Sequence, residues 1–233
     1  MLIGWVTASI AIALFSSAGV WQWRRMHAKQ VSLDAAGHVL TDRTAKSLSI
    51  AADRQRTRLY DWAAGAGRFD ARGALLLDNQ QHNSRNGVRI YRIFVPEQGA
   101  PLLVDLGWLP LGGERNFPQV PRAEGRIEIS GLVTPPPSAG LALGTGLVRE
   151  GENWLLTRVD PVAIASGTGM SVPLAPRVLR LDPALPIGYE RDLEILPNTL
   201  PPERHLGYAV QWFGLALAVF VTALVLTFRK SRR

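Results

Sequence analysis

The residues whose types and spacing could do chemistry lie at the start of a long uncharged segment near the C-terminus. His205 directly precedes that segment, and Tyr208 and Trp212 follow at helical spacing. An imidazole in this place can bind a metal ion, or it can hydrogen-bond a lipid headgroup or a neighbouring domain. The two aromatic rings can stack on a planar ligand or anchor a helix at a membrane surface. The residues alone leave both interpretations, ligand site and interfacial anchor, open.

No catalytic motif accompanies these residues. The sequence has no Cys and only three Met, which excludes disulfides, thiolate metal sites and cysteine nucleophiles and argues against copper carriage. It also lacks His-Glu-x-x-His, Gly-x-Ser-x-Gly, the dinucleotide-binding glycine pattern and the phosphate-binding loop. The carboxylates of Asp70, Asp78 and Asp105 are scattered, so turn and solvent roles explain them better than general acid or base catalysis. We therefore predict that the protein is not an enzyme.

The net charge of +7 is the main feature of the composition that bears on partners. A nucleic-acid-binding protein would carry a block of Lys and Arg with interleaved aromatic residues or a recognisable binding module. Neither is present, so we predict no nucleic-acid partner. A basic protein held on an anionic lipid bilayer is the simpler interpretation.

Two uncharged segments are long enough to cross a bilayer. Residues 206–228 and 2–21 contain no charged side chain, and about 20 helical residues span the roughly 30 Å of a hydrocarbon core. Residues 2–21 are too long for the apolar region of a cleaved signal peptide, and no basic region precedes them, although the small residues Ser16-Ser17-Ala18 leave cleavage as the alternative. We predict a transmembrane helix over 1–23, a β-rich domain over 24–204, a second transmembrane helix over 205–229 and a basic tail over 230–233.

The charges that flank the two segments do not decide the orientation in the membrane. Basic residues lie on both sides, and a large connecting domain can be translocated whatever its charge. The two competing groups are Arg229, Lys230, Arg232 and Arg233 in the tail, and Arg24, Arg25, Lys29 and Arg204 beside the central domain.

Residues between the first segment and the β domain are expected to be helical. Trp21 and Trp23 belong at the headgroup level, with basic residues following in water. We expect the helix to continue to about Ala36, where Gly37 supplies a break. The polar stretch over 41–58 is interpreted as a further helix.

The central part of the sequence has the pattern of a β domain. We predict a hairpin of residues 74–77 and 88–95, turned by Asn86-Gly87, because Asn-Gly is a strong hairpin signal. Further strands are predicted over 101–110, 126–133, 154–159 and 178–181, with a turn at Gly112-Gly113. Asp160-Pro161 has the pattern of a helix cap followed by a first helical residue.

After the last strand, Pro183, Pro186 and Pro197 predict an extended linker back to the membrane. The fold class is therefore an α+β membrane protein. Two transmembrane helices, N- and C-terminal, flank a mostly antiparallel β domain with one or two short helices, and that domain is large enough for its own core.

Four stretches together resemble the surfeit locus protein 1 family of cytochrome c oxidase assembly factors. The first is the exit of the first span, with Trp21, Gln22 and Arg25. The others are Gly67-Arg68-Phe69-Asp70, the central strand ending in Gly107-Trp108-Leu109-Pro110, and the entry into the second span. That entry, His205-Leu206-Gly207-Tyr208 through Trp212-Phe213-Gly214, is the most specific.

The sequence departs from the family pattern at two places. The family usually has Asn-Arg before the glycine-aromatic pair, where this sequence has Asp105 and Leu106. It also usually has Asn before the second-span histidine, where this sequence has Arg204. The role of a basic side chain in the central strand and the hydrogen bonding at the second span are therefore the features expected to differ.

The resemblance implies a function, a location and partners. It implies a cell inner (plasma) membrane protein with both termini cytoplasmic and an extracytoplasmic β domain. The expected partners are cytochrome oxidase subunit I and its assembly intermediates, with the haem a synthesis machinery as a further one. The implied function is to bind or present haem a for insertion into subunit I. A cofactor-free scaffold, and an envelope sensor or enzyme, are the alternatives.

The resemblance also assigns roles to residues. His205 corresponds to the proposed axial ligand of haem iron, with Tyr208 and Trp212 stacking on the porphyrin or donating to a propionate. His27 is considered as a second axial ligand, although a place in the exposed collar explains it as well. Arg24, Arg25 and Arg204 can pair with propionates or with lipid phosphate, and the remaining histidines, His38 and His82, are expected on the surface.

Overall fold

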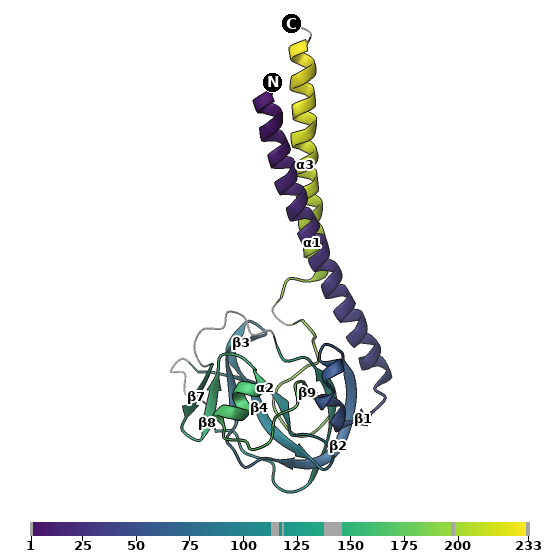
Figure 1. Ribbon diagram of the computed structural model, residues 1–233. Coiled ribbons are helices and arrows are strands. Elements are labelled where there is room, and N and C mark those ends of the chain that lie inside the picture. Colours follow the sequence, from purple (N-terminus) through teal and green to yellow (C-terminus); the bar gives the residue numbers. More distant parts are fainter. Residues whose placement is uncertain (1, 113–116, 118, 138–145, 197–198, 232–233) are drawn as a thin grey trace. The chain divides into compact units, whose positions relative to one another are not determined.

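The computed structural model describes residues 2–112, 117, 119–137, 146–196 and 199–231 (Figure 1). The chain divides into two compact units, which are described separately. One consists of residues Met1–Asp34 and Ile195–Arg233, and the other of residues Ala35–Glu194. The expected arrangement, two apolar terminal helices around a mostly β domain with a short helix, is confirmed.

The helical unit is a pair of long apolar helices. Helix α1 covers Leu2–Asp42 and helix α3 covers Pro202–Ser231. By length and composition, both could cross a membrane. Arg232 and Arg233 of the basic tail lie outside the described residues. Neither helix can be buried by the other along its whole circumference, so most of the apolar side chains face outward.

The two helices pack against each other in opposite directions. Near the start of α1, the indole Nε1 of Trp5 donates to Thr227 Oγ1 at 3.1 Å. Further along, the rings of Phe15 and Trp212 lie 5.7 Å apart, centroid to centroid. Lys29 then donates to the carbonyl of Leu200, just before α3 begins. The residue numbers rise along one helix as they fall along the other, which defines an antiparallel hairpin.

Small residues allow the helices to approach closely. A Cβ built on Gly19 would lie 2.8 Å from Cε1 of Phe213, so the hydrogen of glycine is what fits there. Ala8, Ala209 and Ala216 are also buried. In a bilayer, close backbone approach through small residues is a main source of helix association, because lipid already solvates the larger apolar side chains.

Helix α1 is longer than the sequence predicts. The expected break at Gly37 is wrong, because the helix continues through it to Asp42. A glycine inside a helix costs only about 1 kcal/mol relative to alanine, and the fully buried Ala36 next to it favours the regular structure. The helix ends instead at Arg43, whose φ of 45° and N–H bond to Val39 O form a left-handed C-terminal cap.

A third α-helix predicted over 41–58 is also wrong. Two short 3₁₀ turns, η1 Leu48–Ala52 and η2 Arg54–Arg56, follow a two-residue strand β1 Lys46–Ser47. Ser47 accepts a hydrogen bond from the N–H of Ser49, and Asp53 accepts one from the N–H of Gln55. Such local bonds compete with an α-helix and stop it after one turn.

The described part of the β domain contains eight further strands and one short helix. They are β2 Asp61–Phe69, β3 Leu75–His82, β4 Arg85–Pro96, β5 Leu102–Pro110, β6 Ile127–Thr134, β7 Leu147–Glu150, β8 Asn153–Leu156, α2 Pro161–Gly167 and β9 Val178–Leu181. The predicted β5, β6 and β9 are confirmed, as is Asp160, which caps α2 through the N–H groups of Val162 and Ala163. Strands β1 and β7 and most of β2 were not predicted.

The strands form a sheet that closes on itself. Strands β2, β6, β9, β5 and β4 pair in that order, and β4 pairs again with β2 through Phe69 and Phe94, which completes a ring. Strands β3, β8 and β7 extend from the first part of β4, on the same edge that β2 pairs with further along and opposite to β5. Of the described pairings, β1 with β2, β3 with β8 and β5 with β9 are parallel, and the others are antiparallel.

The sheet has a packed core on each face. The larger one holds Ile90, Phe94, Val104 and Ile129 among its fully or almost fully buried residues. The second is covered by helix α2, which contributes Ile164, and contains the residues that alternate with these along the strands, such as Tyr91, Ile93 and Leu103. Successive side chains point to opposite faces of a strand, so a single strand contributes to both cores.

The predicted hairpin turn at Asn86-Gly87 is wrong by three residues. The turn lies at Asn83-Ser84, which have φ values of 49° and 60°, while Gly87 is a regular β4 residue paired with Gln80. Two positive φ values are the pattern of a type I′ turn, and asparagine tolerates them better than most residues. Gly87 is needed for space, because a Cβ there would lie 2.2 Å from Leu109 O.

The segment after β9 is not a free linker over its first part. Tyr189 donates its N–H to Leu106 O, and Glu190 accepts from the N–H of Trp108, so this segment pairs with β5. The prediction of an extended linker is therefore wrong for the residues around Tyr189. Pro197 of that prediction and Gly113 of the predicted turn lie outside the described residues.

Asp61 at the start of β2 is the centre of a buried ion cluster. Its carboxylate is almost completely buried and lies 2.6 Å from Lys46 Nζ, 2.6 Å from Arg56 Nη2 and 2.7 Å from Arg177 Nη1. Arg177 has no exposed surface and also donates to the carbonyl of Ile50. One carboxylate therefore ties the 3₁₀ segment, β2 and the start of β9 together.

We expect Asp61→Asn to destabilise the β domain by about 3–5 kcal/mol, because it leaves the buried Arg177 without a counter-charge. Burial by itself would raise the pKa of Asp61, but hydrogen bonds from Arg56, Lys46 and Arg177 hold it well below its usual range. Because the folded-state pKa lies below the unfolded value of about 3.9, this stabilisation is present at neutral pH and is lost as the pH falls through the folded pKa.

Urea unfolding of the detergent-solubilised protein at pH 7 and at decreasing pH measures both effects. Glu97→Gln, which breaks an exposed pair with Arg126, is the matched control and should change the free energy of unfolding far less than Asp61→Asn, because solvent screens an exposed pair. Equal effects of the two substitutions would contradict the role of Asp61.

Gly19→Leu should destabilise the helical hairpin by about 1–3 kcal/mol, because the new side chain has no room beside Phe213. Gly4→Leu is the control, since a Cβ at Gly4 meets nothing within 4 Å. Unfolding by sodium dodecyl sulfate, followed by circular dichroism, measures both variants. If Gly4→Leu is the more disruptive, the close approach at Gly19 is not what holds the helices together.

Candidate functional site

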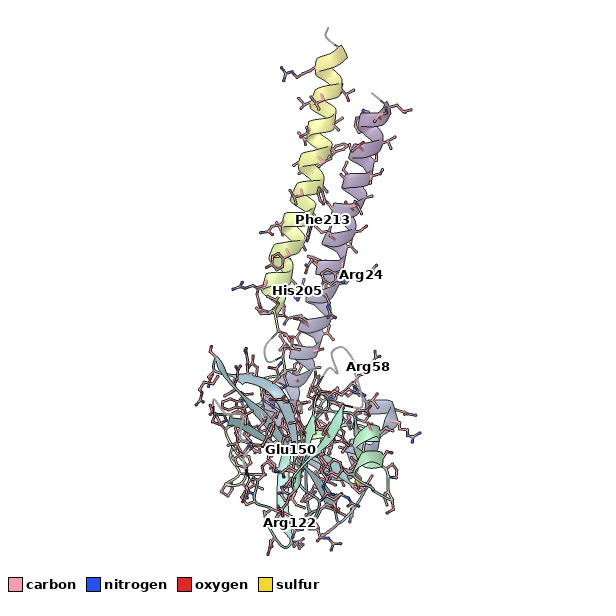
Figure 2. All side chains as sticks on the ribbon, turned by 90° about the vertical axis from the view of Figure 1, so that its left-hand side faces the viewer. Arg24, Arg58, Arg122, Glu150, His205 and Phe213 are labelled. Carbon is pink, nitrogen blue, oxygen red and sulfur yellow. The ribbon has the colours of Figure 1, made fainter. Side chains whose placement is uncertain are left out.

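His205 lies in the first turn of α3, on the side that faces α1 (Figure 2). The residue is only 6% exposed. Its Nδ1 is 2.7 Å from Oε1 of Gln22, which lies on α1. A side-chain amide oxygen is an acceptor only, so Nδ1 carries the proton and donates it to Gln22. The neutral imidazole then has its free lone pair on Nε2.

The Nε2 atom of His205 is buried and has no hydrogen-bond partner. Buried polar atoms in folded proteins are nearly always paired, so an unpaired one calls for a specific explanation. A histidine that binds a metal ion usually donates its other ring nitrogen to an oxygen acceptor, which fixes the tautomer and the ring orientation. The Gln22–His205 pair has this arrangement, and it fits an axial ligand of a haem iron.

Positive charges surround the imidazole. Arg25 and Lys29, one and two turns from Gln22 on α1, are near enough for their charges to act on it. Arg25 is exposed, and Lys29 is half-buried with its ammonium group bonded to Leu200 O. Arg24 and Arg204 are exposed. Ligand carboxylates beside His205 would therefore find guanidinium and ammonium partners from α1.

The other aromatic and histidine candidates lie in different places. Trp212 is half-buried against Phe15, two helical turns after His205 on the same face of α3. Tyr208 is 38% exposed. His27 is exposed and stacks edge-on against Trp23 at 5.0 Å. Because five helical residues turn about 140°, His27 lies on nearly the opposite side of α1 from Gln22, and the structure does not bring it to His205.

The remaining histidines are in the other unit. His38 is exposed, as expected. His82 is not a simple surface residue, because its side chain is only 18% exposed and lies 3.1 Å from Glu190 and 3.6 Å from Asp192. Among the described residues, no group of three or more His, Asp or Glu side chains is arranged to hold a metal ion.

Gly107 and Trp108 hold the segment after β9 in place. Gly107 has a φ of 113°, and a Cβ on it would lie 2.8 Å from Glu190 O. Trp108 is buried, donates its backbone N–H to Glu190 O in that segment, and donates its indole Nε1–H to Gln80 O at 3.0 Å. In the described structure, the contacts of Gly107 and Trp108 therefore hold parts of the fold together.

Asp105, two residues earlier in β5, is buried in an ion cluster. It lies 2.8 Å from Arg89 of β4 and 3.8 Å from Arg180 of β9, and it accepts the N–H of Gly107. Burial alone would lower the pKa of Arg89, but the carboxylate of Asp105 raises it. Neighbouring strands thus supply basic side chains beside the position where this sequence has Asp105 and Leu106 instead of the usual Asn-Arg.

The structure does not bring the three carboxylates considered for catalysis together. Asp70 follows β2 and pairs with Arg72 at 2.8 Å, Asp78 lies in β3, and Asp105 is in the cluster of β5. The partner of His205 on α1 is Gln22, which belongs to the family motif at the exit of the first span but for which the sequence predicted no contact. Its signal was its position one helical turn after Gly19, on the face of α1 that carries the small residue.

Comparison with known proteins gives one family match. A model of the SURF1 family matches residues 9–217, which include Gln22, the Gly107-Trp108 pair and His205. No curated protein matches the sequence. The match covers most of the chain and contains both parts of the site, so this protein belongs to the SURF1 family, which is associated with the assembly of cytochrome oxidase.

Proposed function

We propose that this protein binds haem a at His205 and presents it for insertion into subunit I of a haem-copper oxidase. The observation that carries the proposal is the buried, unpaired Nε2 of His205, whose ring is held by Gln22 through Nδ1. Family membership supports the wider role in oxidase assembly. When bound, haem a would supply an iron centre that the neutral imidazole of His205 could ligate through Nε2.

The residues around His205 have separate tasks in this proposal. Gln22 orients the imidazole and keeps its proton on Nδ1, so that Nε2 is the ligating atom. Arg25 and Lys29 hold the propionates, because their charges already act at the imidazole. The apolar sides of α1 and α3 exclude water and accept the porphyrin plane and its hydrophobic tail. Tyr208 and Trp212 stack against the ring or bond its polar edge.

The same proposal sets the topology. Both termini are cytoplasmic, α1 and α3 cross the cell inner membrane, and the β domain is extracytoplasmic. The oxidase assembly intermediates and the haem a synthesis machinery are then partners on the membrane. The two apolar helices support a membrane location, and family membership supports this orientation, since the flanking charges do not decide it.

A cofactor-free scaffold is the second candidate function. It is favoured by the fact that Phe15 with Trp212 and Gln22 with His205 already join the helices directly. In that case the pair of polar residues serves helix association, and haem is delivered by another protein. The two candidates differ in whether the purified protein carries haem.

His205→Ala should abolish the haem absorption bands of the protein purified in detergent from cells that make haem a, because the iron loses its axial ligand. His38→Ala, which changes an exposed histidine, should leave the bands intact. A colourless wild-type protein that still co-purifies with subunit I would favour the scaffold. Unchanged bands in His205→Ala would contradict the assignment of the ligand.

Gln22→Leu should weaken haem binding about 10–100-fold, as is usual when the acceptor behind a metal-bound histidine is removed. Gln22→Glu should still bind haem, with a lower reduction potential, because a carboxylate makes the imidazole a stronger electron donor. Gln211→Leu, on the exposed side of α3, is the control. Haem titration and redox titration measure these effects, and equal affinities for Gln22→Leu and Gln211→Leu would exclude a positioning role.

A further inference from the structure

Arg92 of β4 occupies a position in the core of the β domain. Its neighbours on the same face of the strand, Ile90 and Phe94, have no exposed surface. Arg92 itself is 6% exposed. An arginine stays protonated in proteins, so this side chain places a positive charge on the inner face of the sheet.

The hydrogen bonds of Arg92 are all to neutral groups. Its guanidinium donates to Arg72 O at 3.1 Å and to Val120 O, while Nε has no partner. Among the described residues, no carboxylate lies within 4 Å of it. Burial lowers the pKa of Arg92, the hydroxyl of Tyr189 acts in the opposite direction, and the charge of Arg122 lowers it again.

The other strongly buried arginines of this domain differ from Arg92. Arg177 has Asp61 at 2.7 Å. Arg180 has Asp192 at 3.2 Å, and Arg89 has Asp105 at 2.8 Å. A buried charge without a counter-charge is strongly unfavourable, and in three cases the sequence supplies an acidic partner. At Arg92 the described residues supply none.

Arg92 borders two cavities. The larger, about 1230 Å³, is lined by Arg72, Arg92, Val120, Arg122, Arg149 and Asn153 together with the exposed Glu150 and Glu152. The smaller, about 310 Å³, is lined by Arg92 and Arg122 with Phe69, Leu106, Ile187 and Tyr189. Figure 2 labels Arg122 and Glu150 on the β domain. Arg92 and Arg122 are common to both cavities.

The arginines of the larger cavity are not equally available. Arg72 is engaged by Asp70 and by the carbonyls of Thr168 and Gly169. Arg149 donates to Gly151 O and stacks on Trp154. Arg122 is 35% exposed at its side chain and reaches Glu124 only at 3.9 Å. The charge least compensated by protein groups is therefore the pair Arg92 and Arg122.

We propose that a small oxyanion, a carboxylate or a phosphate group, binds between Arg92 and Arg122, which line both cavities. Two guanidinium groups match the geometry of carboxylate and phosphate oxygens. The anion supplies the counter-charge that Arg92 lacks, and the apolar side chains of the smaller cavity offer a surface for a short hydrocarbon part of the ligand. The site lies within Ala35–Glu194 and uses none of the residues proposed to hold haem.

The test is a titration of the full-length protein in detergent with inorganic phosphate and, separately, with succinate, in chloride buffers of equal ionic strength. We expect saturable heat in isothermal calorimetry and a rise in the melting temperature of the β domain with at least one of them. Arg92→Met should weaken the affinity at least about tenfold, and Arg122→Gln should weaken it less. Arg126→Gln, whose exposed arginine pairs with Glu97, is the control.

Each outcome has a definite meaning. Binding of phosphate alone, succinate alone or both, lost in Arg92→Met and kept in Arg126→Gln, supports the site and identifies the group it takes. Should Arg92→Met fail to fold, loss of affinity in Arg122→Gln decides in the same way. No saturable binding of either anion, or equal binding by the wild type and both cavity variants, overturns the proposal. Haem binding at His205 is measured independently and is not affected by either result.

Discussion

The hydrogen bond between Gln22 and His205 is the interaction on which the helical unit depends for its chemistry. It joins residues far apart in the chain, and it is possible only because Gly19 and the buried alanines bring the helices close together. It also decides which nitrogen of His205 is protonated. The close contact between the two helices therefore orients the imidazole of His205 and leaves the lone pair of its Nε2 free.

The β domain depends on buried charges in a different way. Asp61 pairs with basic residues of β1, of η2 and of the segment just before β9, and Asp105 pairs with arginines of β4 and β9, so the sheet is tied at these points by ion pairs as well as by its apolar cores. Breaking such a buried pair costs more than its formation contributes, which makes the arrangement specific. Trp108 and Gly107 then fix the segment after β9 against the sheet. The family motif in β5 thus holds parts of the fold together, whereas the family motifs in the helices contain the polar pair Gln22 and His205.

The sequence predicted the elements whose signals are local. The two helices follow from uncharged length, β6 from alternation, and α2 from the Asp160-Pro161 cap. Strand β2 was largely missed because Ala63, Ala64 and Gly65 have low β propensity, and pairing with β6 determines their structure. The contact of Gln22 with His205 could not be predicted from spacing, because it depends on the register of two helices. Arg92 was visible as a charged residue between Ile90 and Phe94, but only the closed sheet shows that this face is buried.

Nitrogen-15 NMR of histidine-labelled protein, recorded before and after addition of haem a, tests the central claim most directly. If Gln22 holds His205 as inferred, its spectrum shows a neutral ring protonated at Nδ1, and haem a shifts the Nε2 resonance of this histidine. A ring protonated at Nε2 in the haem-free protein, or a His205 spectrum that haem a leaves unchanged, would contradict it.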